Sequence, residues 1–541
     1  MIKRLVTLFL LLLVLASATQ LGAESASDRV SRFRKARPIY EKQAFKILMP
    51  CDHPLIVDEL AKVYGGEGDI IFIVGSNPLA DEVLDTAVGK EVFARIHHHS
   101  AKDRRPHVRI AFITGLGRLG NPISVPFLGK LAAGEKDESV LLEAVRSLTK
   151  FKSDDAYDEL FKLCKSLSSV LASLAALEGL QGTICEKTTL LLRELYQGKA
   201  PNIIRGEALR SLYRRGDSLP KETVAAALDD RDTAVRVVAL YIATAEKRTD
   251  LEASFIAMFS APEWEVRSAA IKACAELKIA KAIAPLVELW KNEPGRLGDD
   301  IHKALLKITG KSLGPDWRFW DAWLQGLTEP PQAGEKEGEY ISYHGVKIKS
   351  RNIAFVIDHS GSMEEPASSK AGGYVGEGAV VKDDTRLGFV KAELIRTIKA
   401  LPSDTWFNVI AFDDKVKAWR SQQARASSQI KQDAAQWVDA LKPEGATNIY
   451  DALIQAFGVM NPGGSSNAQR GETGPDTVVL LTDGMPCAGA ITDNIEILKA
   501  IGTINKIRQI TIHTIGVGLE AESLLKPLAE HNGGVYKLIA E

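Results

Sequence analysis

The sequence predicts a multidomain protein in which an α-solenoid is followed by an α/β domain with a doubly wound, mostly parallel sheet. Two observations predict this fold class. Between residues 104 and 326, a motif of small and apolar residues recurs about every 30–35 residues, which is the spacing of stacked helical repeats. Beyond residue 340, short apolar segments alternate with amphipathic segments, as strands and helices do in a parallel sheet.

Length and composition are those of an ordinary globular protein with several domains. The chain has 541 residues, of which 45% are hydrophobic and 25% charged, and its formal net charge is −1. This charge balance does not indicate a nucleic-acid partner, because proteins that bind nucleic acids carry an excess of basic residues.

The first 18 residues have the pattern of a secretory signal peptide. Lys3 and Arg4 precede an apolar run at residues 5–15, and the small residues Ala16-Ser17-Ala18 follow it. The run is too short for a membrane span of about 20 residues. We therefore expect cleavage after Ala18, with Ala23 as the alternative position, no transmembrane span afterwards, and a periplasmic, cell-surface or secreted protein. An uncleaved anchor is the alternative.

Residues 24–100 have a mixed pattern, and we expect them to be helical. The five cysteines are odd in number and widely spaced, which favours neither a disulfide framework nor a zinc site. They are Cys51, Cys164, Cys185, Cys274 and Cys487. Cys164 and Cys274 lie in apolar helical patterns and are expected to be buried, whereas a bridge between Cys51 and Cys185 stays open.

The repeat region is expected over residues 101–327. Each repeat has apolar residues at helical intervals in two successive segments, which indicates a pair of antiparallel helices. The repeat centres are Phe112-Ile113, Ala144-Val145, Ser173-Leu174, Ala208-Leu209, Ala239-Leu240, Ala270-Ile271 and Ala304-Leu305. Because one helix pair cannot bury its apolar face alone, neighbouring pairs should stack into a continuous core.

One motif in this region imitates a dinucleotide-binding loop. Gly115, Gly117 and Gly120 have the spacing of that fingerprint after an apolar segment. However, Pro122 and Pro126 interrupt the helix that the fingerprint requires, and the apolar segment matches the register of the repeats. The sequence therefore favours a helical repeat here.

The segments Asp232–Arg236 and Glu263–Arg267 resemble HEAT repeats. In that family, an arginine at this place ties adjacent repeats through an acidic side chain. The resemblance implies an elongated curved surface on which a second partner could bind, and a pure spacer is the alternative. The aromatic cluster at residues 317–323 is expected to cap the last repeat, and the Pro- and Gly-containing segment 328–339 indicates a linker.

The α/β domain is expected over residues 340–541. Apolar runs predict strands at 352–357, 406–412, 477–482, 510–516 and 535–539. Amphipathic segments predict helices at 387–401, 430–441, 449–460 and 524–529. Parallel sheets of this kind bind ligands at the carboxyl ends of their strands.

Polar residues stand at those strand ends. Asp358 closes the first strand and begins the segment Asp358-His359-Ser360-Gly361-Ser362, Asp483 closes another strand, and Thr447 precedes a helix. Together, in this order, these pieces resemble the metal-ion-dependent adhesion site of von Willebrand factor A-type domains. The resemblance covers the C-terminal third of the chain.

The resemblance implies a role for each residue. Ser360 and Ser362 would bind the metal directly, Thr447 directly or through water, and Asp358 and Asp483 mostly through water and hydrogen bonds. A site built from oxygen atoms suits a hard cation, so Mg²⁺ is expected and Mn²⁺ or Ca²⁺ are alternatives. Because hydroxyl ligands leave the ion incompletely neutralised, an Asp or Glu of a protein partner is the expected last ligand.

The sequence therefore predicts a metal-dependent binding or adhesion protein and not an enzyme. Two alternatives remain: a scaffold whose metal is only structural, and a metal-dependent hydrolase. The chain has neither an H-E-x-x-H nor a G-x-S-x-G motif, which disfavours the hydrolase. The acidic insertion at residues 363–384 begins beside the site, where it could gate the site or be a surface loop, and Cys487 is expected nearby.

Overall fold

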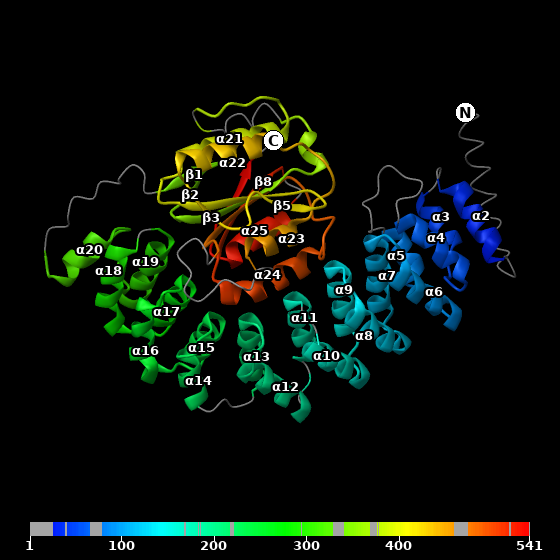
Figure 1. The fold of residues 1–541 in the computed structure, drawn as a ribbon, viewed down its shortest axis with the longest axis horizontal. Coiled ribbons are helices and arrows are strands. Elements are labelled where there is room, and N and C mark those ends of the chain that lie inside the picture. The colour runs from blue at the N-terminus through cyan, green and yellow to red at the C-terminus, as the bar shows by residue number, and fades with distance from the viewer. Residues whose placement is uncertain are drawn as a thin grey trace. The chain divides into compact units, whose positions relative to one another are not determined.

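The computed structural model describes residues 25–37, 41–64, 78–166, 169–181, 183, 185–216, 221–293, 295–327, 340–367, 376, 378–458, 474–518 and 521–539. The predicted signal peptide and the predicted linker at 328–339 lie outside these residues. The chain, whose helices and strands are labelled in Figure 1, divides into two compact units, Met1–Glu159 and Leu160–Glu541. Among the described helices, none combines the length and the apolar character that a bilayer span requires.

The first unit is helical throughout its described part. Its helices are α2 (Ala26–Ala36), α3 (Glu41–Ile47), α4 (Pro54–Tyr64), α5 (Pro78–Leu84), α6 (Lys90–Lys102), α7 (Pro106–Leu119), α8 (Val125–Gly134) and α9 (Glu138–Thr149), and α10 (Asp154–Ser166) contains the division between the units. Local sequence sets the helix ends: Pro106 opens α7, and Asp137 caps α9 by accepting hydrogen bonds from two backbone amides.

The glycines that imitate a dinucleotide loop lie in and after α7. Gly117 faces Ser147 of α9, and a Cβ atom at Gly117 would lie 2.8 Å from the Ser147 hydroxyl. Gly120 ends the helix with a φ of 62°, a left-handed conformation that suits glycine. These glycines therefore permit close helix packing and termination, as the repeat register predicts.

The second unit begins with the remaining helical repeats. Its repeat helices are α11 (Val170–Leu180), α12 (Glu186–Gln197), α13 (Asn202–Arg214), α14 (Lys221–Leu228), α15 (Thr233–Ala245), α16 (Glu252–Ala257), α17 (Trp264–Glu276), α18 (Ile283–Asn292), α19 (Arg296–Thr309) and α20 (Trp317–Leu324). Alternate helices α11, α13, α15, α17 and α19 pack successively against one another, which confirms the stacked arrangement.

Arginines link successive repeats, as the resemblance to HEAT repeats implies. Arg236 pairs with Glu263 at 2.8 Å, and Arg267 pairs with Glu293 at 3.2 Å. At the end of the array, Trp320 is fully buried and donates from its indole nitrogen to the Gly314 carbonyl at 3.0 Å. This burial confirms that an aromatic residue caps the last repeat.

All five cysteines are free thiols. Cys164 and Cys274 are buried, as their helical patterns predict.

The α/β domain contains a two-stranded hairpin and a seven-stranded sheet. The hairpin pairs β1 (Ile341–Tyr343) with β2 (Val346–Ile348). The sheet has the order β5-β4-β3-β7-β8-β9, and β6 also pairs with β4. Its strands are β3 (Asn352–Asp358), β4 (Trp406–Phe412), β5 (Val416–Ala418), β6 (Ala424–Arg425), β7 (Thr477–Thr482), β8 (Thr511–Val517) and β9 (Tyr536–Ile539).

The five longer strands of this sheet are parallel, and only β5 and β6 run antiparallel to their neighbour β4. The domain's helices are α21 (Arg386–Ala400), α22 (Ser428–Asp439), α23 (Ile449–Ala456), α24 (Asn494–Arg508) and α25 (Glu522–His531). Figure 1 shows α21 and α22 on one face of the sheet and α23, α24 and α25 on the other. This two-sided cover explains why β3 and β7 are buried along their whole length.

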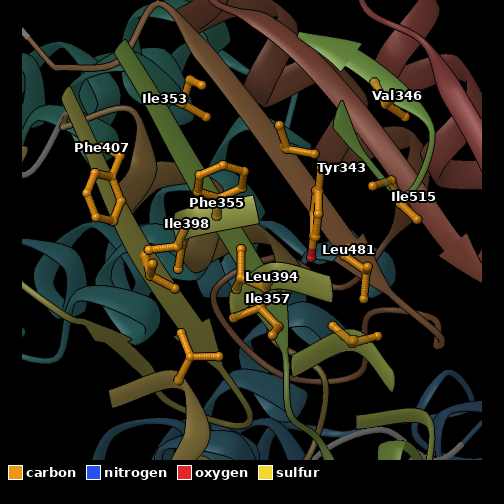
Figure 2. Packing of buried hydrophobic residues seen from close by; sticks show 14 of the residues in the cluster. Tyr343, Val346, Ile353, Phe355, Ile357, Leu394, Ile398, Phe407, Leu481 and Ile515 are labelled. Carbon is orange, nitrogen blue, oxygen red and sulfur yellow. The ribbon is translucent and has the colours of Figure 1, made fainter. Parts of the chain in front are cut away.

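A hydrophobic core lies between the sheet and the helices α21 and α22, and it packs against the central strands. Figure 2 shows Phe355 and Ile357 of β3 beside Leu394 and Ile398 of α21, and each of these side chains is at most 1% exposed. Alternate residues of β3 thus enter this core, while the residues between them face the other helical layer. The carboxyl end of β3 is therefore fixed by packing on both faces.

Candidate metal site at the carboxyl edge of the sheet

The predicted site lies where the chain connections of the sheet change direction. From β3 the chain crosses to β4 on one side, and it later returns to β7 on the other side of β3. The parallel register places Ile357 opposite Leu481, so Asp358 and Thr482 end adjacent strands at the same edge. Such a switch point leaves a crevice outside the strand ends, where ligands bind in open α/β sheets.

The structure brings all five predicted residues together in one hydrogen-bonded chain. The Ser360 and Ser362 hydroxyl oxygens are 3.2 Å apart, and Ser362 donates to the Asp483 carboxylate at 2.7 Å. The Thr447 hydroxyl donates to the Ser360 hydroxyl at 3.3 Å. Asp358 accepts from the Ser360 backbone amide at 2.8 Å. Residues that are up to 125 positions apart in the chain thus share one small polar cluster.

Asp358 is the most deeply buried member of this cluster. Its side chain is fully enclosed, and its second oxygen accepts a hydrogen bond from the Thr482 hydroxyl. Burial raises the pKa of the Asp358 carboxyl to about 7, and the nearby Asp483 carboxylate acts in the same direction. The hydrogen bonds from Ser360 and Thr482 oppose this shift. Without a metal, the ionised form of Asp358 is therefore destabilised, and a bound cation would stabilise it.

The loop that carries Thr447 is held from two sides. The Thr447 amide donates to the Cys487 sulfur at 3.2 Å, and the Cys487 amide donates to the Thr447 carbonyl at 2.9 Å. The next residue, Asn448, caps α23 through its side-chain oxygen. Cys487 therefore lies beside the site, as expected, where it positions the threonine loop.

An arginine that sequence reasoning missed also belongs to the site. Arg386, the first residue of α21, pairs with Asp483 at 2.9 Å and with Glu365 at 3.0 Å. Its side chain is 14% exposed, so the pair with Asp483 is largely shielded from solvent. Glu365 comes from the predicted insertion, which connects that insertion to the site. The arginine's position at a helix start, directly after the predicted insertion, gave no signal of this contact.

The five side chains fit a hard divalent cation. They offer three hydroxyl and two carboxylate groups, which is the oxygen chemistry that Mg²⁺ prefers. Gly484 adjoins two of them: a Cβ atom built there would be in van der Waals contact with the Thr447 hydroxyl at 3.5 Å and the Ser362 hydroxyl at 3.8 Å, so the missing side chain leaves these oxygens uncovered on that side. Each hydroxyl oxygen also retains a lone pair after the hydrogen bonds described above. That these five residues bind a metal remains a prediction.

Family models match both parts of the chain. Residues 383–538 match the von Willebrand factor type A domain, and residues 98–181 and 220–298 match HEAT repeats. Among curated relatives, inter-alpha-trypsin inhibitor heavy chain H2 of Mus musculus is 28% identical over 222 residues, which are 38% of this chain and 20% of that protein. Heavy chain H6 of Homo sapiens is 26% identical over 212 residues, which are 37% of this chain and 14% of that protein. The alignments thus span a fifth or less of these relatives.

Solved structures show partial similarity to the chain. A von Willebrand factor type A protein from Catenulispora acidiphila has 20% identity and a TM-score of 0.27, with 36% of this chain and 40% of that chain covered. The BatB protein from Bacteroides thetaiotaomicron has 16% identity and a TM-score of 0.25, with 36% of this chain and 91% of that chain covered. On the family matches and the observed architecture, this chain contains HEAT repeats and a von Willebrand factor type A domain.

Proposed function

We propose that this chain is a metal-dependent protein-binding protein and not an enzyme. Asp358, Ser360, Ser362, Thr447 and Asp483 hold one divalent cation, Mg²⁺ in the first instance, and the cation binds an Asp or Glu of a partner protein. The HEAT repeats provide a second surface. The basic, apolar and small residues at positions 1–18 support a place of action outside the cytoplasm.

The observation that carries this proposal is the charge balance of the hydrogen-bonded cluster. Two buried carboxylates face a dication, but Arg386 already pairs with Asp483 at 2.9 Å and offsets part of its charge. The hydroxyl groups of the three other ligands are neutral. A bound dication would therefore retain net positive charge at the sheet edge, and a partner's carboxylate is the side chain that best completes it.

The relatives support association as the mode of action. Their names describe heavy chains of a trypsin inhibitor. The von Willebrand factor type A match at residues 383–538 includes Thr447 and Asp483 of the proposed site. We carry over from them only the general expectation that this domain acts by binding.

Selection from a random peptide library tests the proposal without a known partner. The full chain would be immobilised in buffer with Mg²⁺, and bound peptides would be eluted with EDTA. We expect the eluted peptides to share an Asp or Glu, and replacement of that residue by Asn or Gln should abolish binding. A chain carrying Thr447→Val should retain none of these peptides. Peptides that stay bound in EDTA, or that lack a required acidic residue, would contradict the proposal.

The same selection separates partner recognition from a purely structural metal. If the cation only stabilises the domain, Mg²⁺ should raise the melting temperature of the chain without any EDTA-sensitive peptide binding. If the cation bridges to a partner, both effects should appear together and both should be lost in Thr447→Val.

A further inference from the structure

A second group of ligand-type side chains lies on the other side of β3 from the hydroxyl site. His359 follows Asp358 directly, but it is directed toward the residues after β4, whereas Asp358 is directed toward the end of β7. His359, Asp413 and Glu444 each place one nitrogen or oxygen atom within 4.8 Å of the other two. His359 and Asp413 are each 2% exposed, whereas Glu444 reaches solvent.

The hydrogen bonds of His359 determine which ring nitrogen is available. Its Nδ1 atom is 2.8 Å from the Lys442 carbonyl oxygen, which can only accept, so Nδ1 carries a proton. The Nε2 atom is buried and has no hydrogen-bond partner among the described residues. Its closest acidic atom, Asp413 Oδ2, is 3.8 Å away. In the neutral ring, Nε2 therefore presents a lone pair, and the Nδ1 contact with a carbonyl is the one that commonly orients a metal-binding histidine.

The backbone holds the three residues in place. The His359 amide donates to the Phe412 carbonyl at 2.9 Å, directly before Asp413, and the Glu444 amide donates to the His359 carbonyl at 2.9 Å. Asp413 uses Oδ1 to accept from the Lys415 amide at 2.6 Å, which leaves Oδ2 for a ligand.

A glycine makes this close approach of the loops possible. Gly445 has a φ of 71°, and a Cβ atom there would lie 3.0 Å from the Asp413 Cβ and still closer to the Asp414 carboxylate. The segment after Glu444 therefore reaches the end of β4 only because residue 445 has no side chain.

We propose that His359, Asp413 and Glu444 form a second metal site, distinct from the hydroxyl site, for a transition-metal ion of the Zn²⁺ class. One imidazole and two carboxylates favour such an ion over Mg²⁺, which binds oxygen atoms and keeps its water. The exposed side of the site leaves a fourth position for water. The alternative is a buried imidazolium–carboxylate pair, in which Nε2 carries a proton and binds no metal.

The distances require only a small closure of the site. Tetrahedral Zn²⁺ with bonds of about 2.0–2.1 Å holds its ligand atoms about 3.3 Å apart. The His359–Asp413 distance of 3.8 Å is already near this value. Glu444 forms only a loose surface pair with Lys417 at 3.6 Å, with both side chains more than half exposed. Because such pairs contribute little, Glu444 can swing inward at low cost.

Zinc titration of the full chain tests this site. The chain would be stripped with a chelator, saturated with Mg²⁺ to occupy the hydroxyl site, and titrated with Zn²⁺ against a chelating dye. His359→Asn keeps a side-chain amide near the Lys442 carbonyl but removes Nε2. Glu444→Gln changes an exposed residue and leaves the fold undisturbed. Both variants should lose one bound Zn²⁺ or bind it at least about tenfold more weakly.

Two control variants locate the bound zinc. Lys417→Met should bind Zn²⁺ at least as tightly as the unmodified chain, because it removes a competing cation and no ligand. Ser362→Ala alters the hydroxyl site and should retain the zinc, so failure of the hydroxyl site would not imply failure of this one. Unchanged zinc binding in His359→Asn and Glu444→Gln would overturn the proposal, and so would zinc loss in Ser362→Ala.

Discussion

Replacement of Asp358 by asparagine should stabilise the metal-free chain at alkaline pH. The buried carboxyl has a pKa of about 7, against an ordinary value of 3.8. The folded state therefore holds this proton after the unfolded state has released it, so stability falls as pH rises from about 4 to about 7. Three pKa units at 1.36 kcal/mol each set an upper limit of about 4 kcal/mol for the loss above pH 7.

The local structure tolerates the amide. In the Asp358→Asn variant, the side-chain oxygen can still accept from the Ser360 amide, which now donates to Asp358 at 2.8 Å. The Thr482 hydroxyl, which donates to the carboxylate, has the Gly484 carbonyl 3.4 Å away as another acceptor. It can therefore rotate and accept from the new amide group. We expect the free energy of unfolding of the variant to exceed that of the unmodified chain by about 2–4 kcal/mol at pH 8 in chelator, and to equal it at pH 4.

Hydrogen-exchange mass spectrometry of the full chain measures this change locally. The relevant peptides cover β3 and β7, and their exchange rates would be corrected for the intrinsic pH dependence. Asp414→Asn is the control, because that carboxylate lies after the same sheet edge but is exposed. In Mg²⁺ the variant's advantage should largely disappear: the unmodified chain gains about 2.7 kcal/mol at a hundredfold excess over the dissociation constant, and the variant does not. Equal protection at pH 8 in chelator would refute the reasoning.

Three further predictions concern other residues of the α/β domain. Arg386→Met should tighten Mg²⁺ binding several-fold in calorimetry, because it removes the guanidinium that competes with the metal for Asp483. The same change should lower the melting temperature of the metal-free chain, because it leaves the buried carboxylate unpaired. Weaker Mg²⁺ binding would contradict this prediction. Gly489→Ala should lower the free energy of unfolding by more than Gly458→Ala, for which about 1 kcal/mol is expected. Residue 489 has a φ of 95°, and its new Cβ would collide with the Asn448 amide that caps α23, whereas the space around residue 458 is open. Equal melting temperatures for the two variants would count against this prediction. Burial lowers the pKa of His513 to about 4, so the free energy of unfolding should fall as pH drops from about 6.5 to 4. His513→Gln should make this fall shallower. An unchanged dependence of stability on pH in the variant would refute the prediction.

The sequence predicted the parts of the fold that are set by local patterns. The central strands form continuous apolar runs because both faces of β3 and β7 are buried, and the strand ends were visible as the first polar residues. For this reason Asp358 and Asp483 could be placed at one sheet edge without a structure. The helical repeats were visible from their spacing alone.

Some elements of the α/β domain were not predicted. Helix α24 was missed although its buried positions Ile497, Ile501 and Ile504 follow the i, i+4, i+7 spacing of a helix face. The hairpin of β1 and β2 was also missed, because its strands have three residues each.

The wider surroundings of the site were equally hidden from sequence reasoning. Arg386 reaches Asp483 across 97 positions of the chain. His359 was visible only as a variable position between two motif residues, and its neighbours Asp413 and Glu444 come from other loops. Sequence patterns predict residues that follow a strand, but contacts between loops depend on how those loops fold against each other.

Calorimetric titration of the full chain with Mg²⁺ tests most directly whether the hydroxyl groups at the sheet edge bind a divalent cation. Thr447→Val is the decisive variant, because valine keeps the branched shape and removes only the hydroxyl that donates to Ser360. Thr514→Val is its control, since that buried hydroxyl donates to the Leu525 carbonyl away from the site. We predict that the unmodified chain and Thr514→Val bind one Mg²⁺, while Thr447→Val binds it at least about tenfold more weakly. Equal Mg²⁺ binding in all three chains would contradict the assignment.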